Sequence, residues 1–184
     1  MACSQGGPGC APAPAALSER ELLRFERTVC FGECPAYKLD LFEDGRLQYT
    51  GRVAVAVPGP AEVRVAAPAM AKIRSSIQRL SGLNTDCCNC YDSTDSPSVK
   101  MTFTAPGGET KGVDHYHGCD TAPEWLYDVE NSIDETLDSE QWTGKTIRYK
   151  PHRGRRLRTR KIRARDVYAG EPLRARRELA GPVG

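Results

Sequence analysis

Apolar and polar residues alternate with a period of two along several short stretches of the chain, the pattern of half-buried β-strands. We expect strands over residues 22–30, 37–42, 47–53, 99–104 and 110–116. Asp44-Gly45 predicts a hairpin with a type I′ turn, because that turn needs positive φ at both central residues. Pro58-Gly59-Pro60 is expected to end this first hairpin region, and Pro106-Gly107-Gly108 turns a second hairpin.

Two further stretches carry apolar residues at helical spacing. The first begins at Pro68, since proline suits the first turn of a helix, and Gly82 is expected to cap its end. The second opens at Thr121-Ala122-Pro123-Glu124, which has the form of a capping box, and runs to Leu137. The order strand-strand-strand-helix-strand-strand-helix predicts an α+β domain, an antiparallel sheet of about five strands packed on two helices.

Composition divides the 184 residues into three parts. Residues 1–18 are rich in Gly, Pro and Ala and are expected to be disordered, the α+β domain is expected at 19–143, and 144–184 form a basic tail. Residues 145–184 hold 14 Lys and Arg against three acidic residues, whereas residues 1–144 hold 12 against 21. Because 145–184 lack a second apolar stripe, we expect this tail to be disordered and its deletion to leave the unfolding of the domain nearly unchanged.

The chain leaves two localisations open. No apolar run approaches the ~20 residues that span a bilayer, and no secretory signal is present as written, which indicates a cytoplasmic protein. However, Cys3-Ser4-Gln5-Gly6-Gly7 resembles the mature start of a bacterial lipoprotein, and a start codon farther upstream would place the protein in the cell envelope. This alternative governs the interpretation of the eight cysteines, since disulfides persist in oxidising compartments.

The segment Cys30-Phe31-Gly32-Glu33-Cys34-Pro35-Ala36-Tyr37 is either a packing corner with Tyr37 facing the core, a thiol site or part of a disulfide. Its two cysteines are four residues apart in a strand context, so the helix N-terminus that activates a thioredoxin-type C-x-x-C thiol is missing. Cys34 and Cys119 both end strands of the expected sheet. In an exported protein we therefore expect Cys119 to be bridged to Cys34, or otherwise to Cys30.

His115, His117 and Cys119 recur at every second residue, on one face of a continuing strand. Imidazole and thiolate suit zinc, so in a reduced protein this cluster is expected to collect zinc through His117, with Cys30 and Cys34 or the Cys87-Cys88-Asn89-Cys90 cluster as further ligands. The alternative is that Val113 faces the core, His115 partly follows it, and His117 is solvated near the end of the sheet.

No other chemistry is assembled by the sequence. Asp114 and His115 are adjacent, and their side chains should face opposite sides of a strand. No nucleophile motif, phosphate loop or dinucleotide fingerprint is present, so we assign no catalytic residue and no cofactor, with zinc as the alternative.

The basic tail predicts affinity for an anionic polymer or membrane surface without sequence specificity. It contains neither Trp nor Phe to stack on bases. A solvated tail with incidental polyanion affinity is the alternative. The most concentrated basic residues are Arg153, Arg155, Arg156, Arg158 and Arg160.

The pattern C-x-G-x-C-P-x-Y over residues 30–37, followed by Asp44-Gly45 and by Tyr49-x-Gly51, resembles an uncharacterised bacterial family catalogued as a domain of unknown function. The resemblance covers about residues 24–143 and implies the same domain limits and frequent export as lipoproteins, without an activity. The cysteine cluster at 87–90 and the basic tail depart from the family pattern. Further short signatures in the same order are 94–97, 114–118, 130–134 and Trp142.

The leading hypothesis is a non-catalytic binding or structural module, with the bacterial cell envelope as one of its two candidate locations. A thiol- or zinc-dependent enzyme is the first alternative. A polyanion-binding adaptor that acts through its tail is the second.

Overall fold

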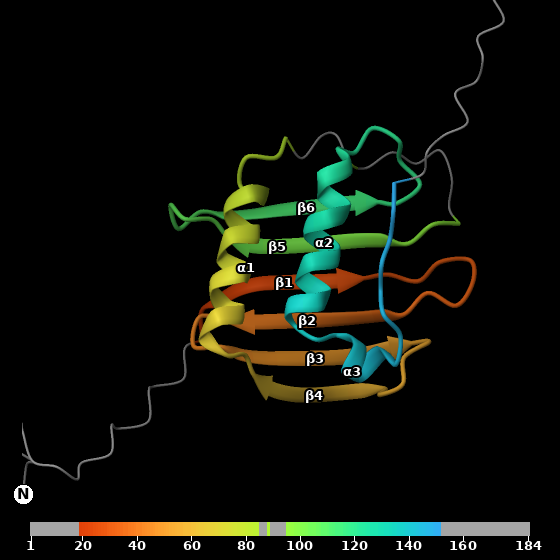
Figure 1. The fold of residues 1–184 in the computed structure, drawn as a ribbon, viewed down its shortest axis with the longest axis horizontal. Helices are drawn as coiled ribbons and strands as arrows, with labels where there is room; N and C mark the ends of the chain where they lie inside the picture. Colours follow the sequence, from red (N-terminus) through yellow and green to blue (C-terminus); the bar gives the residue numbers. More distant parts are fainter. Residues whose placement is uncertain (1–18, 85–87, 89–94, 152–184) are drawn as a thin grey trace, which may run out of the picture. The chain divides into compact units, whose positions relative to one another are not determined.

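A computed structural model of the protein describes residues 19–84, 88 and 95–151. The described chain forms one six-stranded antiparallel sheet with the spatial order β4-β3-β2-β1-β5-β6 (Figure 1). The predicted α+β class is confirmed. The strands are β1 (Glu21–Arg27), β2 (Ala36–Phe42), β3 (Arg46–Val53), β4 (Gly59–Arg64), β5 (Ser98–Thr104) and β6 (Thr110–Tyr116), and the helices are α1 (Ala67–Leu80), α2 (Glu124–Thr136) and α3 (Glu140–Thr143).

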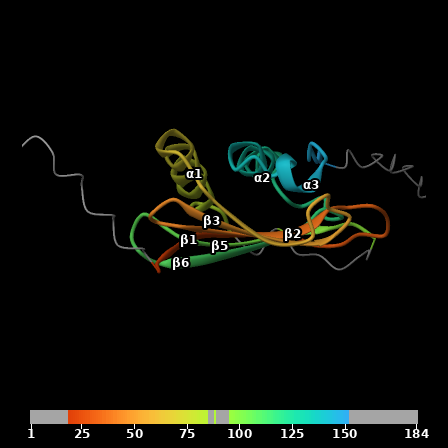
Figure 2. The same ribbon diagram turned by 90° about the horizontal axis from the view of Figure 1, so that it is seen from below.

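All three helices lie on one face of the sheet (Figure 2). Every second side chain of each strand faces the helices. Both long helices face the sheet with an apolar stripe. The core therefore lies between the sheet and the helix layer. It includes Leu23, Phe25, Leu39, Leu41, Met101 and Phe103 from the strands and Ile73, Ile77, Leu126 and Ile133 from the helices.

The other face of the sheet carries charged side chains paired across strands. Arg24 and Asp40 are opposite each other in the β1–β2 register, and Arg24 Nε donates to Asp40 Oδ1 at 2.8 Å. Lys100 Nζ lies 3.7 Å from Asp114 Oδ2 across β5 and β6. These pairs account for the alternation in the sequence, since this face needs no apolar cover.

The first hairpin is present, but its turn is not of type I′. The loop between β2 and β3 has three residues, 43–45, and Gly45 alone has positive φ, +83°. Such loops combine a type I turn with a left-handed glycine. Within the described residues, β4 and α3 are the elements that the sequence pattern did not predict. The prediction that Pro58-Gly59-Pro60 ends the hairpin region is wrong, because Gly59 and Pro60 are the first residues of the edge strand β4. Pro60 is tolerated there because an edge strand can leave one side unpaired.

The two expected helix caps differ from the prediction. The N-cap of α2 is Pro123, without a side-chain hydrogen bond, so the capping box at Thr121 and Glu124 is wrong. At the end of α1 the cap residue is Ser81 in right-handed conformation, not Gly82. Pro68 does lie in the first turn of α1, as predicted.

The Tyr49-x-Gly51 pattern has a packing reason. Tyr49 stacks on Trp142 of α3 with ring centroids 4.8 Å apart, and its hydroxyl donates to the Val57 carbonyl at 3.0 Å. A Cβ at residue 51 would collide with the Tyr49 hydroxyl and with the Val57 carbonyl. Glycine therefore leaves the space that the Tyr49 ring fills.

The packed chain continues past residue 143, the boundary expected from the sequence. Ile147 is buried, and Asn131 on α2 binds both backbone groups of Tyr149, at 2.8 Å to its carbonyl and 3.0 Å from its N–H. Residues 1–18, including Cys3, and 152–184, including the arginines of the tail, lie outside the described residues, as do Cys87 and Cys90. Within the described part of the chain, no helix combines the length and apolar character required to cross a bilayer.

Candidate functional site: a buried polar centre beneath a disulfide loop

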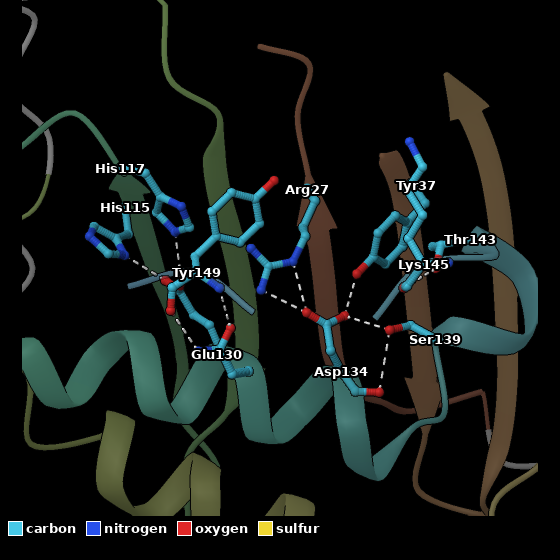
Figure 3. A network of polar contacts seen from close by, with 11 residues as sticks. Arg27, Tyr37, His115, His117, Glu130, Asp134, Ser139, Thr143, Lys145 and Tyr149 are labelled. Carbon is cyan, nitrogen blue, oxygen red and sulfur yellow. Dashed lines mark hydrogen bonds and ion pairs between the residues drawn. The ribbon is translucent and has the colours of Figure 1, made fainter. Parts of the chain in front are cut away.

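A network of buried polar side chains lies between α2 and the ends of β1, β2 and β6 (Figure 3). Its first half is centred on Asp134. Arg27, the last residue of β1, places Nε 2.8 Å and Nη2 2.6 Å from Asp134 Oδ2, and both side chains are buried. Tyr37 and Ser139 donate their hydroxyls to Asp134 Oδ1, Ser139 at 2.9 Å. The carboxylate is therefore saturated with donors.

The charge state of this half follows from the same contacts. Burial by itself would lower the pKa of Arg27, but the negative charge of Asp134 holds that pKa above its ordinary value, and the guanidinium stays charged. Burial, and then the charge of Asp134, raises the pKa of Tyr37 well above 10.0. Tyr37 is accordingly a neutral hydrogen-bond donor.

The second half of the network is centred on Glu130. His115 and His117 come from the end of β6 and the turn after it, two residues apart and on the same side. His115 Nδ1 lies 2.6 Å from Glu130 Oε1, and His117 Nε2 lies 2.8 Å from Oε2. Glu130 and Asp134 are four residues apart and therefore share one face of α2.

The charge states of Glu130 and His117 agree with these hydrogen bonds. Burial would raise the pKa of Glu130, but the hydrogen bonds from His115 and His117 lower it below 4.5, so Glu130 is a carboxylate. Burial is the main cause that lowers the pKa of His117 below 6.5, so this ring is neutral at pH 7 and donates through Nε2. The outward nitrogens, His115 Nε2 and His117 Nδ1, are buried and have no hydrogen-bond partner in the described structure.

Aromatic rings enclose the histidines. Tyr127 lies 4.7 Å from the His115 ring and 4.9 Å from the His117 ring, centroid to centroid. Tyr149, which Asn131 holds in place, lies 4.7 Å from the His117 ring, and Arg27 stacks on it at 4.8 Å. The segment at 144–151 is thus part of the site.

The loop between β1 and β2 leaves the sheet next to this centre. Cys30 and Cys34 are joined in a disulfide with their Cα atoms 5.7 Å apart. The expected bridge from Cys119 to Cys34 or Cys30 is therefore wrong, because the two loop cysteines pair with each other. Cys119 and Cys88 are also disulfide-bonded, and both are buried.

The tip of this loop is exposed. Phe31 is 90% exposed and Val29 56% exposed, although the Phe31 N–H donates to the Asp95 carbonyl at 3.1 Å. Gly32 has a φ of +151°, which a residue with a Cβ adopts only under strain. Glycine therefore suits this position, where the loop turns.

The candidate zinc ligands in the structure differ from the predicted set. His117 is buried and not solvated, and the metal-type donors that converge in the described residues are His115, His117 and Glu130, without Cys119. Asp114 and His115 do face opposite sides of β6, as predicted. Glu130 was missed as a site residue, although its four-residue spacing from Asp134 in the 130–134 signature indicated two carboxylates on one helix face.

Comparison with known proteins identifies the family alone. None of the curated proteins matches the chain. The family model described as domain of unknown function (DUF6438) matches residues 21–137, from the start of β1 to the end of α2. This match covers more than half of the 184 residues and includes all six strands. The chain therefore belongs to the domain-of-unknown-function family DUF6438.

Proposed function

We propose that the domain is a non-catalytic binding module that recognises a protein partner through the tip of the loop between β1 and β2. The observation that carries this proposal is the 90% exposure of Phe31 at the tip of a loop closed by the Cys30–Cys34 disulfide. A large aromatic side chain held in water is costly to display, and such side chains concentrate at protein–protein interfaces.

The way in which the loop is held supports a recognition role. Arg27 and Tyr37 flank the loop in sequence, and both bind the same carboxylate, Asp134. The disulfide closes the middle of the loop, and the backbone bond between Phe31 and Asp95 fixes its tip. A loop already held in one conformation loses little conformational entropy when it binds, so its contacts contribute more fully to affinity.

The exposed side chains of the loop define the chemistry of the partner. Phe31 and Val29 call for an apolar pocket. Glu33 is 92% exposed and has Lys145 3.6 Å away at the edge of the domain, so a basic group of the partner can replace this weak surface pair. The proposed partner is therefore a protein surface with an apolar pocket and a basic rim.

Two further observations support a non-catalytic module of an oxidising compartment. Asp134 is buried and already bound by donors, which suits a structural role. Four cysteines of the described residues are in disulfides, and disulfides persist in compartments such as the cell envelope. The cell-envelope location is part of this proposal.

Site-specific photo-cross-linking tests the proposal. A photoreactive phenylalanine analogue is placed at residue 31 and, as a matched control, at exposed Val63 on the edge strand β4. In the cells that express each variant, we expect the analogue at residue 31, and not the one at residue 63, to cross-link to one partner protein. With that protein purified, Phe31→Ala should weaken binding by roughly thirtyfold, the ~2 kcal/mol of an interface hot spot, whereas Val63→Ala should not change it.

Two results would overturn the proposal. One is the same capture at residues 31 and 63. The other is an unchanged dissociation constant for Phe31→Ala. Because Phe31 is almost fully exposed, this variant should unfold at the same temperature as the parent protein, so loss of folding does not confuse the test.

A further inference from the structure

We propose that His115, His117 and Glu130 form a binding site for a divalent transition-metal ion, with zinc as the ion that the donor set favours. Two imidazoles and one carboxylate are a common protein ligand set for zinc. The site is distinct from the loop tip at Phe31, so the two proposals stand or fall separately.

The geometry brings one ligand atom from each of the three residues close together. These three atoms all lie within 4.8 Å of one another, and Glu130 is within 2.6 Å of His115 Nδ1 and 2.8 Å of His117 Nε2. Atoms bound to one tetrahedral zinc at ~2 Å lie ~3.3 Å apart. Small side-chain rotations would therefore open the hydrogen-bonded triad enough to admit an ion.

Charge also favours a cation. The centre contains the buried carboxylates of Glu130 and Asp134 and the guanidinium of Arg27. Arg27 is in direct contact with Asp134, whereas the groups in direct contact with the Glu130 oxygens are the two imidazoles. A buried carboxylate without a cation is costly, and an ion between Glu130 and the two rings removes that cost.

The hydrogen bonding of the two histidine rings also supports a metal site. In the described structure each histidine has Glu130 as its one hydrogen-bonded side chain, and the second nitrogen of each ring is buried without a partner. The rings are thus oriented toward Glu130 alone. On metal binding, Nδ1 of His115 and Nε2 of His117 exchange their hydrogen bonds to Glu130 for bonds to the ion, and the protons on these two nitrogens move to the outward nitrogens.

Titration of the chelator-treated full-length protein with Co²⁺, followed by competition with Zn²⁺, tests the site. We expect one equivalent to bind, with visible d–d bands and without a thiolate-to-cobalt charge-transfer band. Glu130→Gln should weaken binding roughly tenfold or more. Glu124→Gln, an exposed glutamate on the same helix, and His152→Asn, the third histidine of the chain, are matched controls that should bind as the parent does.

The unsubstituted protein provides a second measurement that does not depend on whether the Glu130 variant folds. Bound Co²⁺ should shift the imidazole proton resonances of His115 and His117 strongly, as expected for rings that coordinate the ion. Three results would overturn the proposal: no stoichiometric binding, a thiolate band that assigns the metal to cysteines, or shifts confined to His152.

Discussion

Arg27 and Asp134 are 107 residues apart in the sequence, yet Arg27 Nε lies 2.8 Å from Asp134 Oδ2 in the core. The pair connects the end of β1 to α2, and Tyr37 extends the connection to β2. Since both side chains are almost fully buried, 1% and 3% exposed, neither charge has water to replace its partner. This relationship links the base of the exposed loop to the helix layer.

Removing one charge of this pair should be strongly destabilising. We expect Asp134→Asn to lower the free energy of unfolding by about 3–5 kcal/mol, because it leaves the Arg27 guanidinium buried and uncompensated. Urea unfolding measures this change. The control is Glu135→Gln in the exposed pair with Arg148, which should change stability by less than about 0.5 kcal/mol. Equal effects at both sites would contradict the structural role of the buried pair.

Acid should destabilise the domain in two steps. The pKa of His117 is below 6.5 in the folded protein, so as the pH falls through 6.5 the unfolded chain binds a proton that the folded chain does not. The folded pKa of Glu130 is below 4.5, so from pH 4.5 downward the unfolded chain again binds more protons, and stability falls further. Urea unfolding between pH 8 and pH 4 measures both steps.

Substitution separates this pH dependence from that of the rest of the chain. His117→Asn should flatten the upper step, just below pH 6.5. A rise in stability on acidification would show that Glu130 is paired with an imidazolium, contrary to the neutral His117 described above.

The Cys30–Cys34 disulfide should contribute less to global stability than a disulfide that closes a long loop. It closes a loop with a sequence separation of only four residues, and the chain-entropy model gives about 2 kcal/mol for so short a loop. The double variant Cys30→Ala/Cys34→Ala tests this by urea unfolding without reducing the disulfides of Cys88 and Cys119. If the free energy of unfolding fell by well over 2 kcal/mol, the disulfide would stabilise the whole fold and not mainly the loop.

Two truncations should behave differently. Deleting residues 144–184 should lower the unfolding temperature by on the order of 10 °C, because it exposes the surface covered by Ile147 and Tyr149. Deleting 152–184 should leave that temperature nearly unchanged and abolish salt-sensitive retention on an anionic resin. Retention that survives the shorter deletion would show that the basic run at 153–165 is not the polyanion-binding element.

The sequence by itself was enough to predict the elements that depend on local periodicity. The strand at 110–116 matches β6, and the helix that begins at Pro68 and the hairpin at Asp44-Gly45 are present. These features depend on side chains within a few residues of one another. Alternation and helical spacing therefore carry the information, and the α+β class follows from their order.

Tertiary structure decided the features that depend on partners distant in the sequence. The position of β1 between β2 and β5, the meeting of His115 with Glu130, and the burial of Arg27 against Asp134 all join separate elements. The cysteine pairing was mispredicted for the same reason. Strand ends of one sheet offered Cys34 several partners, and only the path of the loop brings Cys30 within bonding distance. Local pattern shows which face a side chain occupies, whereas the packing of helix on sheet determines what it meets there.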